Sequence, residues 1–261
     1  MNTVLKGRPS LALSSFESVL DAGEKWLAWV DEAERFRSVL RDKIPWDQLD
    51  GAARAIVQAR LNAASPTSQL LLNSLYLTMA SAFEEFLRAH IQESVNELSS
   101  RRPKYDELKA DLRNLHLREA ARLLRRLDSP PEYLTITTDD LCMAIGSCVS
   151  GSAAVQLCEQ ALGDVDGLIR LESFFERMTA LGRHTSFDVV ARDGGVARAL
   201  GLNGSATRAV AKALKLCVEA VSKNRNRIAH MGSSAADVDR TLIQEHREVL
   251  RAVAMTIGRA A

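Results

Sequence analysis

Arginine, asparagine and histidine stand close together in the stretch Asn-Arg-Asn-Arg-Ile-Ala-His, which runs from Asn224 to His230. Histidine exchanges protons near pH 7, and the planar guanidinium of arginine suits phosphate. An Arg that stabilises phosphate charge and a His that moves a proton are the minimal groups for cleaving RNA without a metal. Arg225, Asn226 and His230 are therefore candidate catalytic residues.

The helix expected over 206–230 determines where these side chains point. Its spacing places Arg225 on an apolar stripe, which is formed by Val210, Leu214, Cys217, Val221 and Ile228. Because a buried guanidinium is costly unless it is paired, Arg225 should meet an acidic group, a second subunit or a ligand anion. Asn226 and His230 are four residues apart on a neighbouring line, so Asn226 can orient His230.

The ends of two helices should meet just after His230. Gly232 suits the position that ends a helix, so His230 should lie in the last turn. Ser233 or Ser234 can cap the next helix, with Asp237 completing a Ser-x-x-Asp box.

Apolar residues in steps of three or four predict helices through most of the chain, over 14–43, 46–62, 67–98, 105–127, 165–181, 206–230 and 235–259. Asp139 or Asp140 should cap another helix, and 184–205 should be an irregular connection around a short helix. Tyr133 to Thr138 is the one stretch expected to be extended. We predict an all-α bundle whose long central helix is 67–98.

The sequence around Arg225 resembles the HEPN superfamily (higher eukaryote and prokaryote nucleotide-binding domains). Arg225-Asn226-x-x-x-His230 matches its R-x(4–6)-H signature with a polar residue after the Arg, and the string Ala-Ser-Ala-Phe-Glu-Glu-Phe-Leu at 80–87 is similar to its opening helix. The likeness covers roughly Pro66 to Arg259 and is closest to the branch of RNA-cleaving toxins and phage or stress defence, in particular the RiboL-PSP-like group.

The resemblance implies a helical domain over 65–261. The signature does not account for an insertion at about 128–204 or for the N-terminal helices in 1–64, which we expect to pack on the bundle. The resemblance also implies a homodimer in which the two Arg225–His230 helices form one composite cleft. There His230 would be the general base or acid, Arg225 would stabilise the phosphorane and Asn226 would position His230 or the phosphate. The product would be a 2′,3′-cyclic phosphate, and neither a metal nor another cofactor is needed. An antitoxin or nucleotidyltransferase partner would restrain the enzyme.

Other interpretations of the same residues remain open. His230 could cap helix carbonyls while Arg225 bonds a core acid, and a HEPN module can be non-catalytic and bind nucleotide or a partner protein. The R-x(4–6)-H spacing also occurs from Arg177 to His184 and from Arg240 to His246. A plain helical interaction protein with an accidental spacing is the third alternative.

Further contacts with RNA are predicted for a set of basic residues beside the signature and on the helix over 105–127: Lys223, Arg227, Arg118, Arg122 and Arg125. Arg113 and Arg126 lie near the last three. The alternative is an ordinary solvated helix face with Glu119 alongside. Trp26 and Trp29 could stack on bases, but core or dimer packing is the favoured interpretation of this pair.

The composition of the chain excludes several classes of protein. The chain has 261 residues, 34 basic and 33 acidic, and a net charge of +1, which excludes indiscriminate coating of nucleic acid through charge alone. No uninterrupted apolar run reaches the roughly 18 residues of a membrane span, so we expect a cytoplasmic protein. The spacing of Cys142, Cys148, Cys158 and Cys217 indicates neither a disulfide framework nor a zinc site, and no His stands near them in the sequence.

Overall fold

The structure is a computed structural model that describes residues 10–63, 69–127, 135–149, 154–164, 168–231 and 238–259. Regular structure in these ranges is helical, and only an isolated bridge between Lys104 and Ala154 resembles a strand. The α-helices are α1 (Leu11–Lys43), α2 (Gly51–Ala63), α3 (Gln69–Ser100), α4 (Ala110–Leu124), α5 (Thr138–Val149), α6 (Glu159–Gly163), α7 (Glu172–Ala180), α8 (Phe187–Ala191), α9 (Gly194–Ala199), α10 (Thr207–Met231) and α11 (Arg240–Arg259). Short 3-10 helices span Trp46–Gln48, Tyr105–Glu107 and Leu168–Arg170. The predicted all-α bundle is confirmed.

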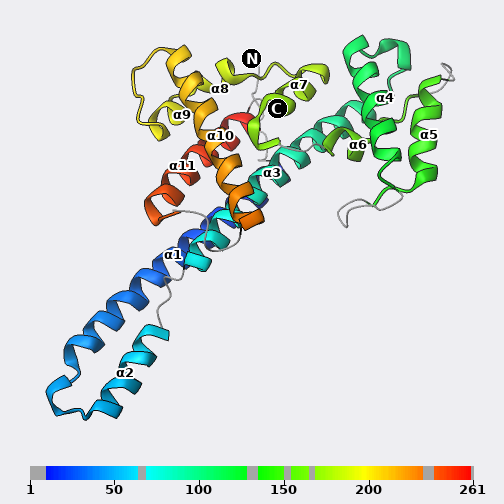
Figure 1. The fold of residues 1–261 in the computed structure, drawn as a ribbon. Helices are drawn as coiled ribbons and strands as arrows, with labels where there is room; N and C mark the ends of the chain where they lie inside the picture. The colour runs from blue at the N-terminus through cyan, green and yellow to red at the C-terminus, as the bar shows by residue number, and fades with distance from the viewer. Residues whose placement is uncertain are drawn as a thin grey trace.

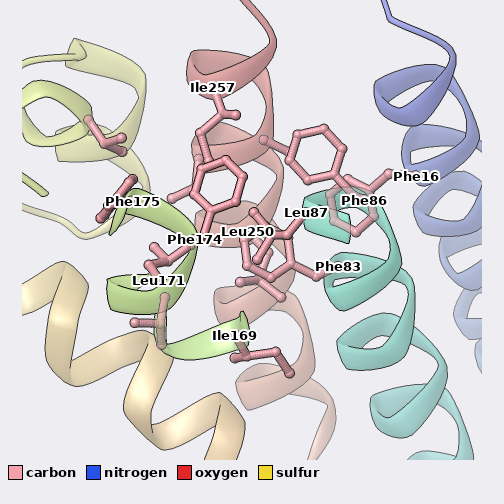
Figure 2. Packing of buried hydrophobic residues seen from close by; sticks show 14 of the residues in the cluster. Phe16, Phe83, Phe86, Leu87, Ile169, Leu171, Phe174, Phe175, Leu250 and Ile257 are labelled. Atoms are coloured by element: carbon pink, nitrogen blue, oxygen red, sulfur yellow. The ribbon is translucent and has the colours of Figure 1, made fainter. Parts of the chain in front are cut away.

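α3 is the central helix, as its apolar spacing predicts. It packs against α1, α6, α7, α10 and α11, and it runs through the middle of the molecule in Figure 1. The ring centroid of Phe16 on α1 lies 5.6 Å from those of Phe83 and Phe86 on α3. Phe174 on α7 and Leu250 on α11 join the same core (Figure 2). Burial of these large side chains is the main force that holds the bundle together.

α1 has a packed half and a projecting half. It begins at Leu11 rather than the predicted Ser14, because the Ser10 hydroxyl accepts a hydrogen bond from the Leu13 amide at 3.1 Å. All its buried residues lie between Ala12 and Val30, where it contacts α3 and α11. Beyond Val30, α1 and α2 form a hairpin that extends away from the bundle (Figure 1). The division into 1–64 and 65–261 stays a prediction.

Two helix starts in the predicted insertion differ from expectation. Thr137, not Asp139 or Asp140, caps α5: its hydroxyl accepts from the Asp140 amide at 3.1 Å, and the Asp140 carboxylate accepts from the Thr137 amide at 3.3 Å. The helix predicted over 165–181 begins only at α7, since Leu171 takes the left-handed backbone conformation with φ of 66°. Leu171 is fully buried, so packing stabilises a conformation that its residue type disfavours.

The connection predicted over 184–205 contains two short helices, α8 and α9, instead of one. Ser186 and Asp193 cap them through side-chain oxygens that accept backbone N–H groups. The predicted extended stretch is not a strand where the structure describes it: residues 135–137 lack regular structure, and Thr138 already belongs to α5. Tyr133 and Leu134 lie outside the described residues.

α11 begins later than the predicted residue 235. Its first helical residue is Arg240, and the Asp239 carboxylate accepts a hydrogen bond from the Leu242 amide at 2.8 Å. The predicted caps at 232–237 lie outside the described residues. Among the described helices, none is long and apolar enough to cross a membrane.

Candidate functional site

The last three turns of α10 carry the predicted catalytic residues. α10 faces α3, α8 and α11, and its buried residues follow a helical stripe: Val210, Leu214, Val218, Val221 and Ile228. Cys217, predicted on this stripe, is only half-buried at its edge. Arg225 falls between Val221 and Ile228 on the side that faces α3, as its spacing predicts.

Arg225 is less buried than the stripe suggests. Its side chain is 37% exposed, because the long guanidinium extends to the carboxylate of Glu84 on α3. Nη2 lies 3.2 Å from Glu84 Oε2, and Nη1 donates to Asn226 Oδ1 at 3.1 Å. Of the three partners predicted for Arg225, the structure therefore supplies the acidic group.

This ion pair joins α3 to α10. Glu84 belongs to the string at 80–87, and its side chain is only 15% exposed. The neighbouring Glu85 pairs with Arg88 instead, so the adjacent carboxylates serve different partners. Residues 141 positions apart in sequence thus meet at one site.

His230 is exposed in the last turn of α10, apart from Arg225. A five-residue step along an α-helix rotates a side chain by about 140°, so Arg225 and His230 face different directions within one chain. Asn226 is in register with His230, but its side-chain oxygen accepts from Arg225. The predicted orientation of His230 by Asn226 is therefore not seen. The structure brings Arg225 and Asn226 together and leaves His230 on a separate exposed face.

Two predicted RNA-binding residues share that exposed face. Lys223, Arg227 and His230 follow one another at steps of four and three, and all three are exposed. The end of α10 thus presents two cationic side chains and one imidazole in a row to solvent.

A second polar cluster, which no sequence pattern indicated, begins at Asn224, the residue before Arg225. Asn224 Nδ2 donates to the Tyr76 hydroxyl at 3.4 Å, and that hydroxyl lies 2.7 Å from His246 Nδ1. Burial raises the pKa of Tyr76 and lowers that of His246, so the hydroxyl donates to a neutral imidazole. The three residues come from α10, α3 and α11, and no sequence spacing could have connected them. The cluster fixes α10 against its neighbours at the base of the site.

The basic residues of α4 are paired with acids. Arg118 Nε donates to Glu119 Oε1 at 3.0 Å and also reaches Glu176, while Arg122 lies 3.5 Å from Glu119. Arg125 is exposed. α4 lies beside the carboxyl end of α3, away from the last turn of α10 (Figure 1). The RNA-binding role of this face stays a prediction, and these pairs favour the interpretation as an ordinary solvated face.

The other two occurrences of the Arg-to-His spacing have structural partners. Arg177 is buried, donates to the carbonyl of Leu162 at 2.9 Å and lies 3.3 Å from Glu119. Arg240 pairs with Asp31 and Glu34 of α1. Only the occurrence at Arg225 has both of its residues open to solvent.

Two cysteines have a histidine neighbour that their sequence spacing did not indicate. His116 Nδ1 lies 3.4 Å from Cys148 Sγ, and His116 Nε2 accepts from the Cys158 amide at 2.9 Å. Burial lowers the pKa of His116 to about 4 and raises that of the Cys148 thiol, so the contact joins two neutral groups. Within the described ranges, no group of three or more metal-ligating side chains is close enough to hold an ion.

No protein-family model, curated protein or solved structure matches this chain.

Proposed function

We propose that the protein is a metal-independent endoribonuclease of the HEPN type that acts as a toxin or as an antiphage or stress-defence effector in the cytoplasm. The observation that supports this proposal is the arrangement at the end of α10. There an exposed His230 follows exposed Lys223 and Arg227, and the adjoining Arg225 keeps part of its guanidinium open to solvent. These are the proton-transfer and phosphate-binding groups that RNA cleavage needs.

The reaction would be an internal transfer within RNA. His230 of one subunit takes the proton from a ribose 2′-hydroxyl, and the 2′-oxygen forms a bond to the adjacent phosphorus. The bond from phosphorus to the 5′-oxygen breaks, and that oxygen takes a proton from water as it leaves, while His230 returns its own proton to the solvent. The products are a 2′,3′-cyclic phosphate and a free 5′-hydroxyl. Arg225 stabilises the negative charge that develops on the phosphorane oxygens.

A second copy of the chain is part of this proposal. Because Arg225 and His230 of one chain face different directions, one phosphate reaches both residue types most simply between two α10 helices. Lys223 and Arg227 would hold the flanking phosphates. An antitoxin or nucleotidyltransferase partner that covers this face would restrain the activity.

The test compares purified wild type with His230→Ala on single-stranded RNA in excess EDTA. We expect cleavage to fall at least about a hundredfold in the variant, as general acid–base groups typically contribute that much. His184→Ala is the matched control, since His184 is exposed but lies outside α10. Mass spectrometry of the products should find cyclic phosphate ends.

Three results would reject the ribonuclease. They are equal cleavage by wild type and His230→Ala, no cleavage by either, or cleavage that EDTA abolishes. The pair between Arg225 and Glu84 favours one alternative, a non-catalytic HEPN module that binds nucleotide or a partner protein. Binding of RNA that survives His230→Ala without any cleavage would support that module.

A further inference from the structure

α1 carries a second apolar stripe, and five of its seven residues are exposed in the chain's own bundle. The stripe has spacings of three and four in strict alternation and consists of Val19, Ala22, Trp26, Trp29, Ala33, Phe36 and Leu40. It differs from the buried face of the same helix, which consists of Ala12, Leu13, Phe16, Leu20, Leu27 and Val30. One helix therefore has two apolar faces, and only one of them is packed.

The exposed stripe has large side chains. Trp26 is 53% exposed, Trp29 is 55% exposed and Phe36 is 65% exposed. The indoles of Trp26 and Trp29 touch edge to face, with ring centroids 5.7 Å apart. Core packing of the two tryptophans, one of the alternatives from the sequence, is therefore wrong for the single chain.

An alternation of three and four over three heptads is the pattern of a coiled-coil seam. A globular helix needs an apolar face only against its own core, and α1 already has one. The additional stripe continues past Val30 into the projecting half of α1, where no residue is buried (Figure 1). This pattern indicates that a second helix packs along α1.

The two flanks of the seam differ. The inner flank, made of Gly23, Val30 and Arg37, adjoins the chain's own packing: Val30 is fully buried and Arg37 donates to the carbonyl of Leu61 at 3.3 Å. The charged residues of the outer flank are Lys25 and Glu32, both exposed and without a partner among the described residues. A parallel pair would set each outer flank against an inner flank, whereas an antiparallel pair sets outer flank against outer flank and inner flank against inner flank. Only the antiparallel pair therefore brings Lys25 and Glu32 of the two copies to the same side of the interface.

Charge then selects the register of an antiparallel pair. With Lys25 opposite Glu32 of the second copy, two-fold symmetry makes this ion pair twice. The same register sets Trp26 opposite Trp29 of the second copy and Ala22 opposite Ala33. Shifting the helices by one heptad would instead set Glu32 against Glu32. The stripe is therefore complementary to itself in one register.

A groove beside the seam fits this register. It has a volume of about 330 Å³, and Val19, Ala22 and Trp26 line it together with Leu75 of α3 and Ile243 of α11. With Trp26 opposite Trp29, Phe36 of the second copy lies over Val19 at this groove. The groove thus receives the most exposed aromatic ring of the stripe.

We propose that two copies of this chain associate through an antiparallel coiled coil of their α1 helices, centred between Leu27 and Ala28. The interface does not involve the end of α10, so it is independent of the ribonuclease proposal. A chain that used both surfaces would form assemblies larger than a dimer.

A charge-swap experiment tests the interface by sedimentation velocity over a dilution series of the full chain. Lys25→Glu and Glu32→Lys should each raise the dissociation constant of the α1 dimer about tenfold, since each replaces two attractive contacts with two repulsive ones. The double variant should return the dissociation constant to within about twofold of wild type. Arg35→Glu is the matched control, because this exposed residue points away from the seam, and it should have no effect.

Circular dichroism should find every variant folded, because all three positions are exposed. A wild type that is monomeric at every concentration would overturn the interface. So would association that neither single reversal weakens, or a double variant that does not recover. Cleavage is assayed separately with His230→Ala, so association that is insensitive to the charge reversals rejects the α1 interface and leaves the ribonuclease proposal standing. A wild type that is monomeric at every concentration would contradict the α10 dimer as well.

Discussion

Replacing His116 should change how the stability of the fold depends on pH. The imidazole is fully buried between α4 and the segment that contains Cys148 and Cys158. Because Nε2 accepts the Cys158 amide, the ring is neutral and carries its proton on Nδ1, beside the Cys148 sulfur. Burial lowers its pKa from 6.5 to about 4.

The magnitude follows from this shift. Between pH 6.5 and about 4 the unfolded chain binds a proton at His116 that the folded chain does not bind. The contribution of His116 to the free energy of unfolding is therefore fully present above pH 6.5. As the pH drops through this window, the free energy of unfolding falls by about 1.4 kcal/mol per pH unit. The total loss is roughly 3 kcal/mol. Burial also lowers the pKa of His90 and His246, which adds acid sensitivity in the same direction.

The assay is urea unfolding of wild type and His116→Gln at several pH values between about 7 and 4. Gln cannot titrate, and its carbonyl oxygen can still accept a hydrogen bond. The variant should be less stable at pH 7 but should lose roughly 3 kcal/mol less than wild type on acidification. His184→Gln, at an exposed position, controls for the loss of a histidine. Parallel pH profiles for wild type and His116→Gln would refute the reasoning.

Three further predictions concern ion pairs and a helix end. Arg177→Met should destabilise the fold by about 3 kcal/mol in urea unfolding, because the buried Glu119 would keep only Arg118 and Arg122, which are more exposed than Arg177. A loss below about 1 kcal/mol would contradict this. Glu84→Gln should lower the dissociation constant for single-stranded RNA a few fold, because Glu84 would no longer compete with phosphate for Arg225. Fluorescence anisotropy measures this constant, and unchanged or weaker binding would show that Glu84 does not compete with phosphate. Gly182→Ala should lower stability by about 1 kcal/mol, since Gly182 ends α7 with φ of +85°; an unchanged melting temperature would argue against that strain.

The positions of the long helices were predictable because their apolar spacing is local. α3 and α10 end within two or three residues of the predicted bounds, and the central place of α3 follows from its long apolar pattern. The break at Leu171 was not predictable, because Leu carries no turn signal. It arises from packing, which buries Leu171 completely in a left-handed conformation.

The partners of the site residues could not be predicted from the sequence, for a different reason. Spacing along a helix predicts which face a residue occupies. It correctly predicted that Arg225 lies on the face of α10 that points toward the bundle. The identity of its partner depends on Glu84, which is 141 residues away, and the contact of Tyr76 with His246 spans 170 residues. The length of the arginine side chain also mattered, because it carries the guanidinium from a core-facing position to half-exposed surroundings.

Burial distinguishes Arg177 from Arg225, two of the three arginines that are separated by four to six residues from a following histidine. Arg177 and Glu119 are both almost completely buried, and Arg118 and Arg122 contact the same carboxylate, so separating the pair would break a buried network of charges. The pair of Arg225 with Glu84 is open to water on the arginine side, and such pairs contribute about 1 kcal/mol or less. Two hydrogen bonds from a guanidinium to a phosphate, each worth about 1.5–3 kcal/mol, exceed that cost. A phosphate can therefore replace Glu84 at Arg225, whereas no phosphate could displace Glu119 from Arg177.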